Sequence, residues 1–386
     1  MLAAHLDENK FKVTLYERNA AVGRKFLVAG DGGFNLTHSE EKDQFIKRYT
    51  PENFLLPAFT SFNNSDLRDW LQAIGIETYV GSSKRVFPIK GIKPIDVLNA
   101  IINELKRKNI TIKTNHQWIG WQNEKLLFEA CPPLEGTGEG PDSAIIIFSL
   151  GGSSWKVTGS DGNWTNHFSE NGIGIIPFRP SNCAYEVKWK DEFLRIAEGK
   201  SIKNISVSCK SKEKKGELVI TRFGLEGGAI YALSPEIRKQ LKYDKVATIF
   251  IDLKPHLTLE QITDKFATRG NRSIKKLLVD RLSLDDTSIE LLKSLSSKDE
   301  FIDLEQLAKK IKHLPITLTA AAPIDEAIST VGGISLEEVD QHFQLKKFPN
   351  TYCIGEMLDW DAPTGGYLLQ ACFSMGYYLA QHLNSK

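Results

Sequence analysis

The stretch IGEMLDWDAPTGGY, residues 354–367, carries the pattern on which the fold of this 386-residue chain depends. A short apolar strand is followed by an acidic residue, Glu356, and then by a loop. Two glycines next precede a helix, which we expect to reach Leu383. The first turn of a helix has free backbone N–H groups and a partial positive charge. The sequence therefore predicts that the start of this last helix can hold an electron-rich group.

A second acidic residue, Glu17, ends a predicted strand near the beginning of the chain. A dinucleotide-binding fold places a carboxylate at about this point, where it accepts hydrogen bonds from two ribose hydroxyls. A strand that ends in a solvated glutamate is also commonplace. Glu17 by itself therefore leaves a purely structural role open.

Glycines and basic residues follow that strand closely. Gly23 precedes Arg24 and Lys25, and the segment GDGGFNLT occupies residues 30–37. Such glycines let backbone N–H groups approach an anion or a flat ring, and the two basic side chains could neutralise a pyrophosphate. The alternative is a flexible turn beside a solvated basic pair.

A third glycine pair, Gly151 and Gly152, follows an apolar run over residues 144–150 that we expect to be a strand of a parallel sheet. Doubly wound folds hold their ligand at the carboxyl ends of such strands. A flavin suits the whole pattern, because its N1 and C2 carbonyl edge becomes anionic on reduction and could face the last helix. Glu356 could then hold a ribityl hydroxyl.

Together these segments resemble a known family, the bacterial FAD-dependent oxidoreductases related to BaiN, which include aminoacetone-oxidase-like members. The resemblance covers almost the whole chain and extends to the segment RPSNC at 179–183. It implies a glutathione-reductase-type FAD fold, hydride transfer through the flavin to an unidentified small organic substrate, and NAD(P)H as a candidate electron donor. It also implies the cofactor-binding residues, which are Glu17, Arg24, Lys25, Gly32, Asn35, Gly355, Glu356, Gly366 and Tyr367.

Two features depart from that family. The family begins with a buried strand and a G-x-G-x-x-G turn, and we expect an in-frame segment upstream of Met1 to encode both. The segment FGLEGGA at 223–229 stands where many relatives have Ser-Gly-Pro, so a substrate cannot be carried over from any one relative.

The fold class that we expect is α/β, a Rossmann-like FAD-binding domain with an inserted antiparallel β unit and a small helical subdomain. The FAD-binding domain would comprise residues 1–178 and 335–386. The β unit would comprise 179–256 and 315–334, where short strands alternate with glycine, lysine and serine clusters. The helical subdomain would comprise 257–314, beginning with a capping box from Thr258 to Gln261. The inserted parts would cover the flavin and shape the substrate cavity.

The amino-acid composition of the chain limits the kinds of partner that the protein can have. Hydrophobic residues make up 41% and charged residues 25% of the chain, which excludes disorder, and the net charge of +1 gives no general attraction for nucleic acid or anionic lipid. No apolar run is long enough for a bilayer, and no secretory peptide is recognisable. The five cysteines contain no C-x-x-C pair, and the eight histidines show no metal-ligand spacing. We therefore expect a cytoplasmic protein with a small-molecule substrate, without a metal, a nucleic-acid partner or a membrane.

Two other functions remain open on the sequence alone. One is a flavin-containing regulatory or RNA-associated protein, which the charge balance disfavours. The other is a degenerate scaffold that no longer binds FAD. The catalytic residues and the oligomeric state are not assigned by any motif.

Overall fold

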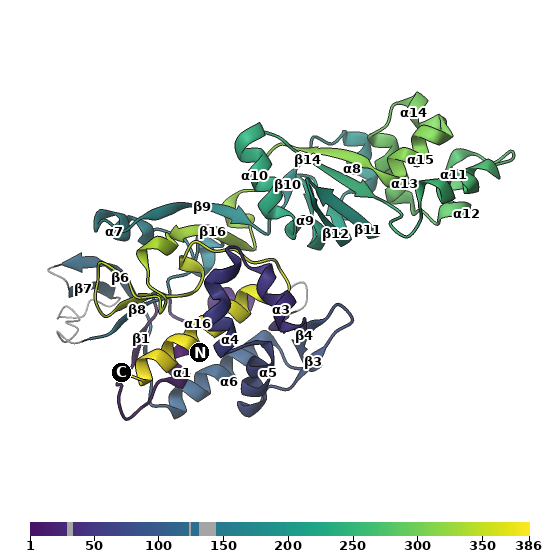
Figure 1. Cartoon of the computed structure of the whole chain (residues 1–386). Helices are drawn as coiled ribbons and strands as arrows, with labels where there is room; N and C mark the ends of the chain where they lie inside the picture. The colour runs from purple at the N-terminus through teal and green to yellow at the C-terminus, as the bar shows by residue number, and fades with distance from the viewer. Residues whose placement is uncertain (29–33, 123–124, 131–143) are drawn as a thin grey trace. The chain divides into compact units, whose positions relative to one another are not determined.

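The structure is a computed structural model that describes residues 1–28, 34–122, 125–130 and 144–386. The chain divides into two compact units (Figure 1). Unit 1 contains residues 1–179 and 329–386, and unit 2 contains residues 180–328. Unit 2 is thus inserted in the sequence of unit 1.

Two parallel strand pairs form the framework of unit 1. Strand β1 (Thr14–Tyr16) pairs with β5 (Thr111–Lys113), and β8 (Ile146–Phe148) pairs with β17 (Thr351–Cys353). Both pairs are parallel, and for β8 the apolar run before Gly151 predicted this arrangement. Because β8 and β17 are parallel, the residues that follow them emerge at the same edge.

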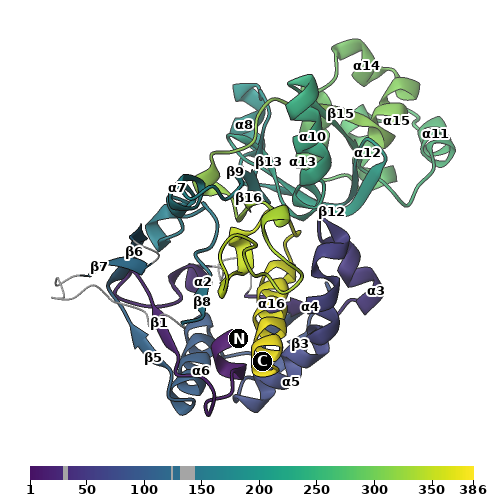
Figure 2. The ribbon, with the colours of Figure 1, turned by 60° about the vertical axis from the view of Figure 1, so that its left-hand side comes forward.

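The last helix, α16 (Tyr367–Asn384), is the main helix of unit 1 (Figure 2). It packs against α1 (Leu2–His5) and α4 (Leu56–Ser61). Its buried side chains belong to a core that also contains Phe148, Phe168 and Tyr352. This core fixes the helix next to the β8–β17 pair.

The remaining elements of unit 1 comprise helices of up to 14 residues and short antiparallel strand pairs. The antiparallel sheet β2-β4-β3 comes between β1 and β5 in the sequence, and β9 pairs with β16 where the chain enters and leaves unit 2. The bounds are α2 (Arg24–Val28), β2 (Thr37–His38), α3 (Lys42–Phe45), α5 (Asn64–Ala73), β3 (Thr78–Val80), β4 (Arg85–Pro88), α6 (Pro94–Arg107), β6 (His116–Gln122), β7 (Lys125–Ala130), α7 (Trp164–Glu170), β9 (Ile175–Ser181), β16 (Ser329–Ile334) and the 3₁₀ turn η6 (Gly355–Met357).

Unit 2 is built on a six-stranded antiparallel sheet in the order β10-β13-β12-β11-β14-β15. Its strands are β10 (Tyr185–Glu186), β11 (Ser201–Cys209), β12 (Lys212–Ile220), β13 (Gly224–Glu226), β14 (Ala247–Asp252) and β15 (Leu314–Leu318). Its helices are α8 (Asp191–Ala197), α9 (Gly228–Tyr231), α10 (Ser234–Asp244), α11 (Leu259–Ala267), α12 (Ile274–Leu282), α13 (Asp286–Ser294), α14 (Lys298–Ile302) and α15 (Leu304–Lys312).

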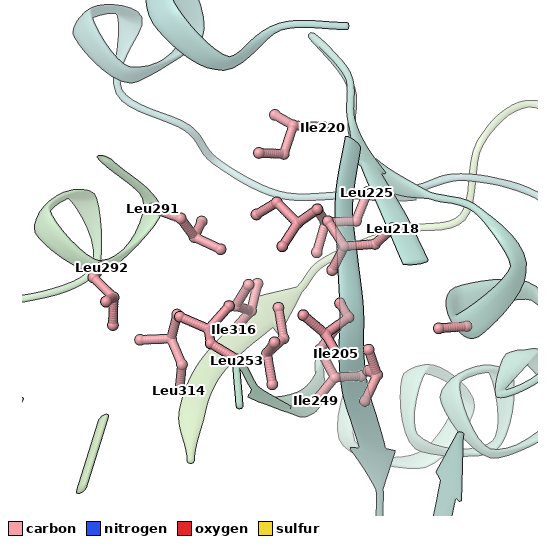
Figure 3. Close-up of a cluster of buried hydrophobic side chains, with 14 of the residues drawn as sticks. Ile205, Leu218, Ile220, Leu225, Ile249, Leu253, Leu291, Leu292, Leu314 and Ile316 are labelled. Carbon is pink, nitrogen blue, oxygen red and sulfur yellow. The ribbon is translucent and has the colours of Figure 1, made fainter. Parts of the chain in front are cut away.

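The strands and helices of unit 2 share one hydrophobic core (Figure 3). Leu218 and Ile249 from the sheet belong to the same buried cluster as Leu291 and Leu292 from α13. The predicted capping box is confirmed, since the Thr258 hydroxyl accepts a hydrogen bond from the backbone N–H of Gln261, and the backbone N–H of Thr258 donates to Gln261 Oε1. In the part of the chain that the structure describes, no helix is both long and apolar enough to cross a membrane.

Candidate functional site

Glu17 follows β1 directly, and one of its two carboxylate oxygens is hydrogen-bonded to Asn19. Glu17 Oε1 accepts hydrogen bonds from the backbone N (2.8 Å) and side-chain Nδ2 (2.9 Å) of Asn19. Arg24 Nη1 donates to Asn19 Oδ1 at 3.1 Å. Glu17 Oε2 receives no hydrogen bond from any residue that the structure describes, so it is free to accept one from a ligand.

Lys25 and Glu356, which lie 331 residues apart in the sequence, form an ion pair. Lys25 Nζ lies 2.9 Å from Glu356 Oε2 and also donates to Ser154 Oγ (3.0 Å) and Ser160 Oγ (3.3 Å). The Glu356 side chain is only 8% exposed, and its Oε1 accepts the backbone N–H of Thr330 at 3.0 Å. This pair joins four segments of unit 1 at one point.

Gly152, which follows β8, is packed against the same pair. A Cβ at this position would overlap Thr330 Oγ1 and lie 2.9 Å from Glu356 Cδ. The glycine is therefore required for the close packing of the strand end against Glu356.

The start of α16 is formed by two glycines with positive φ angles, +113° at Gly365 and +95° at Gly366. A Cβ on Gly366 would lie 2.5 Å from the Cα of Thr37 in β2, so only glycine allows this approach. No side chain of the described residues caps the helix. Its first-turn N–H groups are thus available to another acceptor.

A buried polar network holds α16 against β2. Thr37 Oγ1 donates to Gln370 Oε1 at 2.7 Å. Gln370 Nε2 donates to the carbonyl oxygen of Phe62 (3.2 Å) and to Ser374 Oγ (3.1 Å). Because every one of these groups is buried, each hydrogen bond fixes the position of the helix.

Tyr367, the first residue of α16, lies in a cluster of aromatic and charged groups. Its hydroxyl donates to Glu40 Oε2 at 2.9 Å, and its ring stacks on His38 with centroids 5.1 Å apart. Arg48 Nε donates to Glu40 Oε2 at 2.9 Å, and Arg48 Nη2 also pairs with Glu40 Oε1. Tyr49 Oη donates to the carbonyl oxygen of Tyr367 at 2.9 Å.

Burial and these contacts set the protonation states in the cluster. Burial and the hydrogen bond to Glu40 raise the pKa of Tyr367, which therefore stays a neutral phenol. Burial opposes ionisation of Glu40, but the hydrogen bonds from Arg48 and Tyr367 outweigh it and lower the pKa of Glu40 overall. Burial lowers the pKa of His38, and the positive charges of Arg48 and Arg85 act in the same direction.

The other predicted cofactor residues are less tightly placed. Gly355 opens η6 with φ +83°, and its N–H lies 3.2 Å from Met375 Sδ. Asn35 is half-buried between the buried Phe34 and Leu36. Gly32 lies outside the described residues. The structure thus places Glu17 with Arg24, Lys25 with Glu356, and Gly366 with Tyr367, as three local groups within unit 1.

These groups fit a dinucleotide with a ring at one end. Glu17 offers a carboxylate oxygen for ribose, and the start of α16 has no side-chain cap among the described residues. The Lys25 ammonium lies near the strand ends, but it is already bonded to Glu356, Ser154 and Ser160. Sequence reasoning missed Glu40, Arg48, Tyr49 and Gln370, since single polar residues in and before helices carry no motif. For Gln370 the one available signal was a polar residue on the apolar face of the last helix.

A family model and two curated relatives match nearly the whole chain. A family model described as "HI0933-like protein Rossmann domain" matches residues 1–382. The chain is 23% identical to a 3-dehydro-bile acid delta(4,6)-reductase of Clostridium scindens, with 97% of this chain and 93% of the relative covered. It is 24% identical to a ribosomal RNA dihydrouridine synthase of Haemophilus influenzae, with 98% and 94% covered. The solved structure of a 3-ketosteroid-delta4-(5alpha)-dehydrogenase from Rhodococcus jostii RHA1 aligns with this chain at a TM-score of 0.45 and 9% sequence identity. The alignment covers 100% of this chain and 94% of the dehydrogenase chain.

Proposed function

Since the chain belongs to the HI0933-like family of Rossmann-domain proteins, we propose that it is an FAD-dependent oxidoreductase that reduces a carbon–carbon double bond conjugated to a carbonyl group. Both curated relatives suggest this reaction by their names. The 4,6 double bonds of a 3-dehydro bile acid are conjugated to its C3 carbonyl. Dihydrouridine is uridine whose C5–C6 double bond, conjugated to the C4 carbonyl, has gained two hydrogens. The substrates differ, but the bond that is reduced has the same electronic character.

The observation that carries the proposal is the convergence of three strand ends in unit 1. Glu17 follows β1, Gly151 follows β8 and Gly355 follows β17. Arg18, next to Glu17, donates to Asp161 Oδ2 in the segment after β8 at 3.0 Å, and the Lys25–Glu356 pair connects the segments after β8 and β17 through Ser154. Rossmann-type folds bind their cofactor at such carboxyl ends. This placement supports FAD binding across them.

Each residue would have a separate task. Glu17 Oε2 would accept ribose hydroxyls, Arg24 and Lys25 would lie near the pyrophosphate together with Gly32 and Asn35, and Glu356 would face the ribityl chain. The helix start at Gly366 and Tyr367, with Gly355 beside it, would lie at the ring. Bound FAD supplies hydride transfer to the carbon β to the carbonyl, while the protein orients the substrate and directs a proton to the α carbon.

The first experiment is reconstitution of the purified chain with FAD. We expect a visible flavin spectrum that stays with the protein on gel filtration, and bleaching under anaerobic conditions by NADH or NADPH, our proposed electron donors. Flavin that separates completely from a folded protein would overturn the proposal and favour a scaffold. Bound flavin that is reduced by dithionite but reoxidised by no conjugated enone would favour a regulatory flavoprotein.

RNA uridine is the second candidate substrate, because two relatives are named as ribosomal RNA dihydrouridine synthases. The net charge of +1 favours a small molecule instead. Anaerobic mixing of the reduced flavoprotein with a steroid-type 4,6-dien-3-one or with uridine-containing ribosomal RNA separates the two candidates. The substrate that reoxidises the flavin identifies the class.

The described cysteines also bear on where the reaction takes place. Cys183, Cys209, Cys353 and Cys372 are free thiols. Free thiols are typical of proteins in a reducing compartment. We therefore propose the cytoplasm as its location.

A further inference from the structure

Arg85 is a charged side chain beside the start of α16 that no motif singled out. It is the first residue of β4, and it lies directly across the antiparallel β2–β4 pair from His38. Its Nε lies 3.5 Å from the position that a Cβ on Gly365 would occupy. Arg85 therefore lies next to both the imidazole of His38 and the glycines that open the helix.

The surroundings of Arg85 differ from those of the neighbouring Arg48. Arg48 is neutralised by two hydrogen bonds to Glu40. Arg85 is half-buried, yet its guanidinium makes no hydrogen bond or ion pair with residues 1–28, 34–122, 125–130 or 144–386. Partly buried charges in proteins are normally paired, because removing them from water costs free energy. An unpaired guanidinium at this place needs an anionic partner.

The nearby carboxylate is not free to serve Arg85. Glu40 already accepts both hydrogen bonds from Arg48 and a third from Tyr367. The cluster thus combines two guanidinium groups and an imidazole with a single carboxylate. It is electropositive, and no described residue accepts a hydrogen bond from the Arg85 guanidinium.

We propose that Arg85 binds an anionic oxygen formed during flavin-dependent reduction. This inference rests on the proposed function. Hydride transfer from reduced flavin to the β carbon moves the electron pair of the double bond onto the carbonyl oxygen, which becomes an enolate oxygen. The guanidinium donates hydrogen bonds to this oxygen until the α carbon takes up a proton and the carbonyl re-forms. The same chemistry would suit the C2 oxygen of the reduced flavin, so two sources of the oxygen must be distinguished.

The test compares Arg85→Gln with Lys84→Gln, both in the FAD-loaded protein. Lys84 is the preceding residue, and its side chain is exposed, so its replacement removes the same charge from the same turn without touching the cluster. Because Arg85 has no partner among the described residues, Arg85→Gln should leave the Tm within a few degrees of wild type. A larger drop in Tm would show a structural role and would overturn the inference.

The first arm tests whether Arg85 binds a substrate-like anionic oxygen, and it measures the affinity for a phenolate. A para-substituted phenolate is added to the oxidised flavoprotein, and binding is followed by the long-wavelength charge-transfer absorption of the flavin. We expect Arg85→Gln to weaken phenolate binding by about ten- to hundredfold, the usual range for a charged hydrogen bond. Lys84→Gln should change it less than about twofold.

The second arm tests whether Arg85 binds the C2 oxygen of the reduced flavin. It measures the midpoint potential of the flavin by potentiometric titration without substrate. If the flavin is the source, Arg85→Gln should lower the midpoint potential by about 30 mV for each tenfold loss of binding to the reduced form. A change in either arm supports the inference and identifies the source. If neither phenolate binding nor potential changes while the wild type holds FAD, the inference is overturned and the proposed function stands. Absence of bound flavin in the wild type would overturn both.

Discussion

Replacing Lys25 by methionine should destabilise unit 1 even without a cofactor. The substitution leaves the Glu356 carboxylate, which is 8% exposed, with Thr330 as its remaining protein donor, through the backbone N–H at 3.0 Å and the hydroxyl at 3.4 Å. Breaking a fully buried ion pair costs about 3–5 kcal/mol. The Lys25 side chain is 29% exposed, so water can partly replace the ammonium, and we expect a loss of about 2 kcal/mol.

A second substitution distinguishes the contribution of the ion pair to stability from that of side-chain packing. In the double variant Lys25→Met/Glu356→Gln, the buried charge is gone, and the amide oxygen can still accept the Thr330 N–H. We therefore expect the double variant to be about 1 kcal/mol more stable than Lys25→Met alone. With the single variant Glu356→Gln included, the cycle gives the coupling energy, which for residues in contact is about 0.5–3 kcal/mol.

Urea unfolding followed by tryptophan fluorescence suits this measurement. All of the seven tryptophans except Trp189 lie in unit 1, so the signal reports mainly the unit that contains the ion pair. Arg107→Met, which removes an exposed pair with Glu104 in the same unit, is the matched control and should leave the midpoint nearly unchanged. If Lys25→Met shifts the midpoint no more than this control, or if the two substitutions are simply additive, the ion pair does not stabilise the fold as argued.

Three further predictions concern the cofactor, a glycine and pH. Glu17→Ala should weaken FAD binding at least about tenfold, because charge-assisted hydrogen bonds are worth roughly 1.5 kcal/mol or more each; an unchanged Kd in calorimetric titration would refute the ribose assignment. Gly366→Ala should lower the Tm strongly, because the new Cβ would lie 2.5 Å from Thr37 Cα. A Cβ at Gly228 would have no atom within 4 Å, so the control Gly228→Ala should not lower the Tm in this way. Equal changes in Tm for the two variants would contradict the prediction. Burial is the main cause that lowers the pKa of His382 below its usual 6.5, and the positive charge of the stacked His342 lowers it further. The folded state then binds fewer protons, so stability should be complete above about pH 6.5 and fall below it. His382→Gln should lessen that fall between pH 7.5 and 5.5, as measured by Tm, and an identical pH profile would exclude this histidine as its cause.

Local pattern was enough to predict several parts of this fold. The apolar run before Gly151 predicted a parallel strand, and the polar spacing at Thr258 predicted a helix start, because both depend on residues close together in the sequence. The alternating short strands after Pro180 likewise predicted the antiparallel sheet of unit 2. The Rossmann class is confirmed by the family match. The assignment of single residues to FAD stays a prediction.

Contacts between distant segments could not be predicted in the same way. Nothing local to Lys25 or to Glu356 indicates that they form an ion pair, and the pairing of Arg85 with His38 depends on the register of β2 against β4. Gly366 shows the same limit. The sequence suggested that the glycine admits a flavin ring, while the structure gives an additional reason, the close approach of the Thr37 backbone. The residue type was informative, but its neighbour was set by tertiary packing.

The insertion of unit 2 has a consequence for synthesis on the ribosome. Strand β8 can pair with β17 only after residues 180–328 have been made, because β17 begins at Thr351. The 202 residues between Phe148 and Thr351 take about 10–40 s at roughly 5–20 residues per second. Unit 2, which is continuous in sequence, can fold during that time, whereas the first half of unit 1 must wait with the pairing edge of β8 unsatisfied. The nascent chain is therefore most exposed to strand-to-strand aggregation before its last 58 residues emerge, and slowing translation within unit 2 should lengthen that exposure.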